Sequence, residues 1–384
     1  MIRTSKIKKI SCLLLCLMMI FPLGGCWSYQ GINELAIVTG VAIDKDASTG
    51  NYKLTYEIVD LTKNIKQTGI QPKIVEAQGK TLLDANKNAK KRMVNKLYFG
   101  NTQVVIVSKD VAKEGISSIV DWFIRDIECR ETLHLVVSQQ NTAKELLKSK
   151  GIDDTLVASE INKIIRGDGD VTASTRNIEL YDVFNTLKAD GISVTLPAFH
   201  KVKNNKEPAV EVNGVGVFKK DRLIGFLTPR ETNYYLFAIN EIHSGLLTLS
   251  LKGKSSEDVS LQVYKNKTKV SCSYKDGKAK AQIKVKTAVS LDELGISLGL
   301  INKRDIKKIE KKEDRKLEKE IKGVIKKVQT DFGSDIFGFG NCLYKSNPKV
   351  WRQIRPKWDK LFKKMDVDVK CEITIINTES LIKN

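Results

Sequence analysis

The chain has few of the residues from which catalytic and metal sites are usually built. It holds only three histidines, His134, His200 and His243, in 384 residues. None stands at metal-ligand spacing to another histidine or a cysteine, and HExxH does not occur. GxSxG, P-loop and dinucleotide-binding fingerprints are also missing. The sequence therefore predicts no catalytic residue, metal or cofactor, and it favours a binding protein over an enzyme.

Weaker patterns do not change that conclusion. Gly214 and Gly216 lie inside a predicted strand with no helix after them, and the DFG at 331–333 lacks every other kinase element. The densest group of charges has helical spacing, typical of a solvated salt-bridge face; its members are Asp121, Arg125, Asp126, Glu128, Arg130 and Glu131. Asp44, Asp46 and Ser48 resemble the start of a calcium loop, but Thr55 stands where a bidentate glutamate is needed. We interpret 44–50 as a hairpin turn.

Paired cysteines are also lacking. Of seven cysteines, Cys12, Cys16 and Cys26 lie near the N-terminus. The other four are widely spaced without a CxxC pair; they are Cys129, Cys272, Cys342 and Cys371. An exported protein can form disulfides, but this spacing favours buried free thiols and leaves their oxidation state open.

Only one long apolar run occurs, at residues 11–21 (SCLLLCLMMIF), after a segment that carries four basic residues. A membrane span needs roughly 20 apolar residues, so this shorter run is typical of a cleaved export signal. An uncleaved anchor or a cut elsewhere are the alternatives. We predict that residues 1–25 form a lipoprotein signal peptide.

The end of that signal matches a bacterial lipobox. Leu23, Gly24 and Gly25 supply the branched and small residues that signal peptidase recognises, and the next residue is Cys26. The Cys26 thiol can take a diacylglyceryl group, and cleavage before it frees an amine for acylation. Two acyl chains anchor a protein effectively permanently. We therefore predict that Cys26 is the lipid attachment site and that the body lies outside the bilayer.

The body is large and strongly basic. Removing residues 1–25 leaves 359 residues, enough for two or three domains. The whole chain has a formal charge of +20, and four positive charges leave with the signal, so the body carries about +16. Export argues against nucleic acid as the partner. An anionic lipid surface, an acidic partner, or simply a lysine-rich soluble surface remain as explanations.

The first half alternates strand and helix patterns. Strands are predicted at 37–43, 52–59, 102–108, 133–138 and 192–199, and helices at 81–97, 116–127 and 142–148, with two more between 151 and 190. This favours a layered α/β or α+β arrangement. We assign 26–200 to the N-terminal domain or domains, with a sub-boundary near 145–150. The charged, turn-forming run 201–208 is the predicted main boundary.

The second half, 209–384, is predicted to be an α+β domain. A hairpin spans 209–227, Thr228 is the expected N-cap of a helix, and an antiparallel meander covers 259–289 with turns at 266–267 and 276–277. The longest helix, 302–330, carries an apolar stripe that Glu313 interrupts. We favour packing of this helix over the meander, against a membrane-surface or coiled-coil role. A Gly/Phe turn, a short helix around 348–363 and a final strand at 367–376 follow. The fold class is thus α+β, with several domains of mixed and antiparallel sheets.

Six stretches, in order along the whole body, resemble the Ger(x)C-type lipoproteins, the C subunits of spore germinant receptors. They are Gly25–Trp27 (GCW), Asn33–Asp46, Leu97–Ser108, Asp121–Ser138, Gly214–Leu227 and Asp335–Gly340 (DIFGFG). The tryptophans Trp351 and Trp358 also fit the family pattern. Family members usually carry an acidic residue where Ser28 stands and Glu where Asn341 stands, so the receptor complex served is left open.

The resemblance implies a lipid-anchored, non-enzymatic subunit on the outer face of the spore inner membrane. It implies partnership with the A and B membrane subunits of a receptor that couples nutrient sensing to germination, and it argues against a directly bound small ligand. The alternative is a solute-binding lipoprotein that delivers a small ligand to a transporter. That alternative predicts two doubly wound lobes around a cleft. An envelope enzyme is the third and weakest reading.

Overall fold

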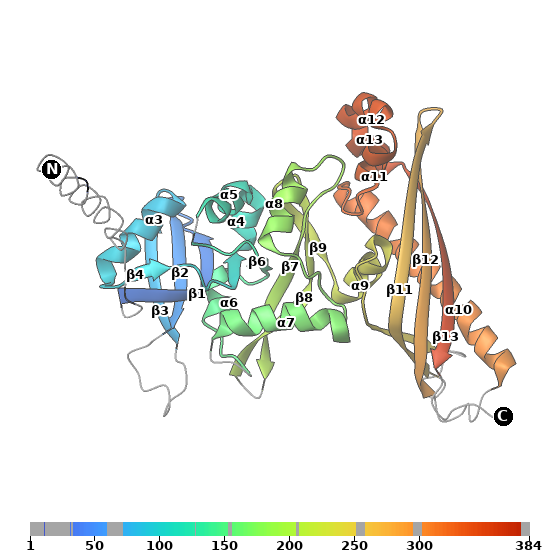
Figure 1. The fold of residues 1–384 in the computed structure, drawn as a ribbon, viewed down its shortest axis with the longest axis horizontal. Helices are drawn as coiled ribbons and strands as arrows, with labels where there is room; N and C mark the ends of the chain where they lie inside the picture. Colours follow the sequence, from blue (N-terminus) through green and yellow to red (C-terminus); the bar gives the residue numbers. More distant parts are fainter. Residues whose placement is uncertain are drawn as a thin grey trace, which may run out of the picture.

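The structure is a computed structural model that describes residues 11, 31, 34–59, 72–126, 128–152, 156–204, 207–250, 258–294 and 302–377. Within this part the strands form two sheets, one of nine strands and one of four. The molecule is elongated, with the nine-stranded sheet and its helices over one part of its length and the four-stranded sheet at the far end (Figure 1).

The larger sheet has the order β3-β2-β1-β5-β6-β7-β8-β9, and β4 pairs with the start of β1. Its strands are β1 (Leu35–Lys45), β2 (Tyr52–Val59), β3 (Pro72–Gly79), β4 (Lys96–Tyr98), β5 (Val104–Val107), β6 (His134–Ser138), β7 (Thr195–Asn204), β8 (Glu207–Lys219) and β9 (Arg222–Leu227). The central strands β1, β5, β6 and β7 are parallel, while antiparallel hairpin partners extend both edges.

Helices cover both faces of this sheet, because the central strands are apolar on both sides. Every residue of β5 and β6 is buried, which is the pattern of a parallel strand between two layers. One face packs on α3 (Leu82–Ala89), α4 (Lys109–Glu114), α5 (Ser117–Arg125) and α8 (Leu180–Lys188). The other face packs on α6 (Ala143–Leu147) and α7 (Val157–Val171).

Two buried acids attach the helices of the second face to the sheet. The Asp44 carboxylate accepts the backbone N–H groups of Ala143 and Lys144 at 2.7 and 3.0 Å, at the start of α6. Glu57 accepts those of Val157 and Ala158, at 2.8 and 3.2 Å. Unpaired N–H groups at a helix start favour a negative charge. Asp44 is therefore a helix cap. The expected β1–β2 hairpin is present, but Asp44 and Lys45 still belong to β1, so the turn begins at Asp46.

The charged run 201–208 lies within the larger sheet. β7 and β8 pair from Thr195 with Val217 as far as Asn204 with Glu207. The first two strands of the second half of the chain therefore complete the sheet that the first half begins. The domain limits drawn from the sequence remain a prediction, but the sheet itself continues across residue 208.

The smaller sheet has the order β10-β11-β12-β13. Its strands are β10 (Leu246–Ser250), β11 (Asp258–Lys275), β12 (Lys278–Leu294) and β13 (Asp366–Asn377). β10, β11 and β12 are antiparallel, whereas β13 is parallel to β12. The β11–β12 turn at Asp276 and Gly277 has φ of 50° and 75°, as a two-residue turn between right-twisted strands requires.

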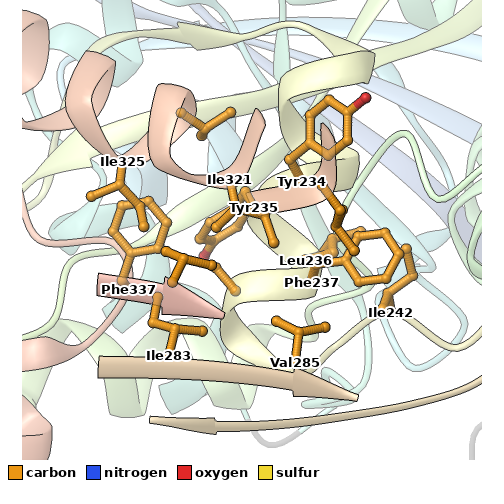
Figure 2. Packing of buried hydrophobic residues seen from close by; sticks show 14 of the residues in the cluster. Tyr234, Tyr235, Leu236, Phe237, Ile242, Ile283, Val285, Ile321, Ile325 and Phe337 are labelled. Carbon is orange, nitrogen blue, oxygen red and sulfur yellow. The ribbon is translucent and has the colours of Figure 1, made fainter. Parts of the chain in front are cut away.

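One face of this sheet carries the second core. It packs on α9 (Pro229–Ile239) and α10 (Lys303–Lys327), joined by α11 (Phe339–Ser346), α12 (Pro348–Ile354) and α13 (Trp358–Lys363). Figure 2 shows Ile321 and Ile325 of α10 packed with Tyr235 of α9 above Ile283 and Val285 of β12. The expected packing of the long helix over the sheet is confirmed. Thr228 and Glu231 form the predicted cap of α9.

Carboxylates of α10 also satisfy the edge of this sheet. Ile375 donates its backbone N–H to Glu310 at 2.9 Å, Ile373 to Asp314 at 2.7 Å, and Cys371 to Glu318 at 3.0 Å. The three acids, spaced four residues apart, are called the acid ladder below. An open strand edge invites pairing with another chain, and the acid ladder occupies three of the outward N–H groups of β13.

Three expectations about elements are wrong. The helix expected over 81–97 ends at Ala89, a 3₁₀ turn follows over Lys90–Arg92, and residues 96–98 form β4 beside β1. The turn expected at 266–267 is the middle of the 18-residue β11, whose nearby irregularity is a bulge between Val263 and Lys265. The turn expected over 331–340 contains the start of α11. In the first two cases pairing with another strand, β1 or β12, overrides the local pattern.

The mixed α+β class, with sheets packed by helices, is confirmed. Among the described residues no helix is both long and apolar enough to span a bilayer.

Candidate functional site

The two sheets are connected by a buried turn centred on Asp335. Its carboxylate accepts the backbone N–H groups of Phe337, Gly338 and Gly340 at 3.1, 2.9 and 2.8 Å, and the indole N–H of Trp358 at 3.2 Å. Asp335 is 4% exposed. Burial raises the pKa of its carboxyl to about 6, although the donated hydrogen bonds act in the opposite direction. The turn is thus held closed by one buried acid.

This turn lies against the loop that precedes β7. Ser193 donates its N–H to the Asp335 carbonyl at 2.8 Å, and Asn341 donates to the Gly191 carbonyl at 2.9 Å. The Ser334 hydroxyl is 2.8 Å from that of Ser193 and donates to the Phe218 carbonyl at 2.7 Å. We call the facing segments 189–193 and 333–341 the joint.

Two glycines allow the backbones of the joint to touch. A Cβ on Gly191 would lie 2.4 Å from the carbonyl carbon of Gly340, and a Cβ on Gly340 would lie 2.7 Å from the Cα of Gly191. Gly191 also has φ of +70°, where glycine avoids the strain of a side chain. Both positions therefore require the absence of a side chain.

Polar groups surround an open cleft of about 520 Å³ beside the joint. Asp190 pairs with Arg355 at 2.8 Å and accepts the Trp351 indole N–H at 3.4 Å. Lys219 pairs with Asp359 at 2.9 Å. These two ion pairs join Asp190 and Lys219 to the segment 355–359 at the start of α13, which is the arrangement of a polar domain contact.

A second connection lies between α7 and α9. The Arg176 guanidinium makes two 2.6 Å hydrogen bonds to the Glu241 carboxylate, the bidentate geometry that makes such pairs strong. The Tyr235 hydroxyl donates to the Ile336 carbonyl at 3.2 Å and lies 3.3 Å from Thr195. The helix beneath the small sheet therefore contacts the larger sheet and the joint together.

The residues singled out from the sequence fall in different places. Cys26, Leu23, Gly24 and Gly25 lie outside the described residues. In the body, His134 is buried with its Nε2 2.8 Å from Asn177, and burial lowers its pKa. His200 pairs with Glu211 at 2.8 Å on the β7–β8 hairpin. Within the described part, no group of three or more His, Cys, Asp or Glu side chains could hold a metal ion.

The four body cysteines are free and partly buried, which agrees with the expectation of unpaired thiols. Burial raises the pKa of the Cys129 thiol to about 12. Cys272 on β11 donates to Cys342 on α11, and this hydrogen bond lowers the pKa of Cys342 to about 7. The charged cluster at 121–131 is a surface feature, with Arg125 3.9 Å from Asp121 and Glu128 2.5 Å from Lys96.

Sequence reasoning missed the joint itself. It marked 335–340, 214–227 and the two tryptophans as separate matches, and the structure brings these three stretches together. Asp190, Gly191 and Arg176 carried no signal of their own, because their partners lie 65 to 161 residues away.

The comparisons with known proteins cover both halves of the chain. A family model described as the spore germination protein N-terminal domain matches residues 28–201, and one described as spore germination B3/GerAC like, C-terminal, matches residues 213–379. Spore germination protein KC of Bacillus subtilis is 26% identical, with 96% of each chain covered. Spore germination protein B3 of the same organism is 26% identical over 94% of this chain and 95% of its own.

The fold has a solved counterpart. The crystal structure of the GerBC protein matches with a TM-score of 0.59 and 21% identity, covering 88% of this chain and 97% of that one. The resemblance drawn from the sequence motifs is thereby confirmed. Since the two family models together span nearly all of the described body, the chain belongs to the GerAC-like family of spore germination proteins.

Proposed function

We propose that the protein is a lipid-anchored, non-enzymatic subunit of a spore nutrient germinant receptor. Membership in a family of spore germination proteins supports a role in germination. The observation that carries the proposal is that the similarity runs over both halves and in the same order as in full-length relatives. The receptor's A and B membrane subunits are the proposed partners.

The proposed mechanism is scaffolding. Lipids on Cys26 hold the body at the outer face of the spore inner membrane, which raises its effective concentration toward membrane subunits. The joint supports this role because it makes the body one connected object, with polar contacts at two places between the sheets. A rigid connector transmits a displacement from one partner to another better than two loosely tethered domains.

The alternative of a solute-binding lipoprotein has one feature in its favour, the cleft of about 520 Å³ beside the joint. Two of its four cationic groups, Arg355 and Lys219, are already paired with Asp190 and Asp359, and Lys188 and Lys220 are the other two. The smaller sheet is also not a doubly wound lobe. A saturable thermal shift with an amino acid or a sugar would favour this alternative over the scaffold.

The test uses spores that carry Cys26→Ala in place of the natural chain. We expect the variant to leave the membrane fraction and nutrient-triggered dipicolinate release to fall toward that of the deletion strain, while non-receptor triggers still act. Cys16→Ala, a cysteine of the same predicted signal, is the matched control and should keep both properties. Full membrane retention of the Cys26 variant would contradict the anchor, and normal nutrient response in the deletion strain would contradict the receptor role.

A further inference from the structure

The two faces of the four-stranded sheet differ sharply. The inward face is apolar and packs on α9 and α10. The outward face carries exposed lysines at alternating positions of three adjacent strands, which are Lys265, Lys267, Lys269 and Lys275 of β11, Lys278, Lys280, Lys284 and Lys286 of β12, and Lys370 of β13. We call this surface the lysine face. Period-two alternation puts all of these ammonium groups on one side.

Like charges stand directly opposite one another across the strands. Lys267 pairs in register with Lys286, Lys275 with Lys278, and Lys284 with both Lys269 and Lys370. Like charges in opposite positions destabilise a sheet. Acids of β13 reach only part of the face, through Lys286 with Glu372 at 2.6 Å and Lys280 with Asp366 at 3.8 Å. Lys267, Lys269 and Lys284 make no ion pair with any described residue. Within the described residues, folding therefore relieves this repulsion only at Lys286 and Lys280, and an external anionic surface would relieve the rest.

The lysine face also contains a shallow hollow of about 220 Å³. Lys265, Lys267 and Lys286 surround it, and Ala288 and Thr374 are among its lining residues. These two side chains are short, so they leave room for an anionic group to approach Lys265 and Lys267. The hollow is also lined by the Glu372 carboxylate, which pairs with Lys286 at 2.6 Å.

From these observations we propose that the lysine face binds the surface of an anionic phospholipid bilayer. The charges sit on flat sheet and come from lysine, a flexible point charge without the bidentate fork with which arginine recognises a fixed carboxylate. Such an array suits a mobile layer of phosphate headgroups, to which each lysine adds attraction independently. Tyr264, 72% exposed beside Lys265, and Ile376, 53% exposed on β13, supply an aromatic ring and an apolar group suited to the headgroup region.

This inference does not depend on the lipid at Cys26 or on the receptor role. Figure 1 places the four-stranded sheet at the end of the molecule away from β3 and β4. The lysine face would therefore be a contact separate from the proposed anchor. Since the first strand of the body begins at Leu35, a chain starting at Trp27 retains every described strand and can be tested without signal or lipid.

The experiment measures flotation of the chain from Trp27 with two kinds of vesicle, phosphatidylcholine alone and an equimolar mixture of phosphatidylcholine and phosphatidylglycerol. We expect binding to the anionic vesicles only, decreasing as salt rises. Lys267→Glu/Lys269→Glu/Lys284→Glu should lower the partition coefficient at least about 100-fold, since each lysine contributes about fivefold. The corresponding triple Gln variant, which tests whether charge reversal merely unfolds the sheet, should also bind weakly while keeping the wild-type circular dichroism spectrum.

The matched control is Lys87→Glu/Lys90→Glu/Lys91→Glu, which changes the net charge equally at exposed positions of the larger domain. It should retain binding within about fivefold. Equal binding to both kinds of vesicle, or equal loss in the two Glu variants, would overturn the proposal. Absence of binding to either vesicle would also overturn it, and retention on immobilised polyglutamate would then point to an acidic protein as the occupant.

Discussion

At the scale of single residues, Gly191 and Asp335 are the positions on which the joint depends most. A side chain at residue 191 would overlap the backbone of Gly340, and the carboxylate of Asp335 holds that backbone in place. A side chain that deforms the turn therefore disturbs hydrogen bonds on both segments of the joint. The loss of stability caused by this overlap can be measured separately from the loss that any side chain causes at a residue with positive φ.

Gly191→Ala should lower the free energy of unfolding by about 2–4 kcal/mol, from the positive φ together with the clash. Gly277→Ala is the matched control, because Gly277 has a similar φ of +75° but open space around its Cβ position; it should lose only about 1 kcal/mol. Urea unfolding of the two variants measures the difference. Equal losses would show that the close approach at the joint contributes nothing to stability.

Little at this scale could be predicted from the sequence. Asp335 is one of 45 acidic residues. It begins the DIFGFG stretch that carries part of the family resemblance, but nothing in that stretch indicates that its carboxylate is buried. Its burial follows from packing against Trp358 and against a loop more than 140 residues earlier in the chain. The joint is formed by contacts between segments that are far apart in the sequence. The sequence pattern therefore marked the separate segments but could not show that they meet.

At the scale of elements, α10 combines three different surfaces. Its apolar stripe packs on the sheet, its acid ladder binds β13, and its remaining residues face solvent. The stripe was predicted because a 3.6-residue period is visible over 25 residues. The acid ladder was not, since glutamates on a solvated face and glutamates that bind an edge strand have the same spacing. Conversely, β11 was divided in two, because a bulge and a turn both interrupt the alternation of a strand.

Glu313 is the one acid of α10 that lies in the apolar stripe. It is 1% exposed, and its nearest cation is Lys316 at 3.7 Å. Burial raises its pKa to about 7, reinforced by Asp314 and Glu320 and opposed by Lys316. Because the folded-state pKa lies above the ordinary 4.5, the folded chain keeps a proton that the unfolded chain has released. The contribution of Glu313 to stability is therefore present below pH 4.5 and is lost as the pH rises to about 7.

Glu313→Gln should remove this pH dependence. At pH 8 the variant should be more stable than the natural chain by up to about 3 kcal/mol, and near pH 4 the two should be equal. Urea unfolding at several pH values measures the gap. Glu207→Gln, at an exposed acid of the β7–β8 hairpin, should show no such gap. A difference between wild type and Glu313→Gln that stays constant with pH would contradict the raised pKa.

At the scale of the whole molecule, the joint decides whether the two sheets behave as one body. Their contact combines apolar and polar parts. The core of the smaller sheet includes Val215, Val217 and Leu227 of the larger sheet, and the four hydrogen bonds that the Asp335 carboxylate accepts hold one segment of the joint in shape. Loss of a buried acceptor leaves its donors unsatisfied, which costs about 1–3 kcal/mol for each donor. The four-stranded sheet should respond first, because it has fewer strands than the larger sheet and carries its core on one face only.

Asp335→Asn should therefore increase hydrogen exchange in β11 and β12 by at least about tenfold while β5 and β6 stay protected, since opening then becomes local. Hydrogen–deuterium exchange with mass spectrometry measures both sheets in one sample. Asp359→Asn, at an exposed acid that pairs with Lys219 near the same cleft, is the control and should leave both sheets unchanged. Equal acceleration in both sheets would mean that the body opens as one unit and that the joint does not separate its parts.

The acid ladder along β13 has a consequence for how α10 can be placed. Four residues of helix advance about 6.0 Å, whereas two residues of strand advance about 6.6 Å. Three rungs accumulate about 1.2 Å of mismatch, and a fourth would bring it to about 1.8 Å, beyond the range of hydrogen-bond lengths. The next helix position in the series is Lys322, whose ammonium group can only donate, and it pairs with Asp368 at 3.4 Å. Because the helix repeat and the strand repeat differ in length, the three hydrogen bonds can form together at only one position of α10 along β13.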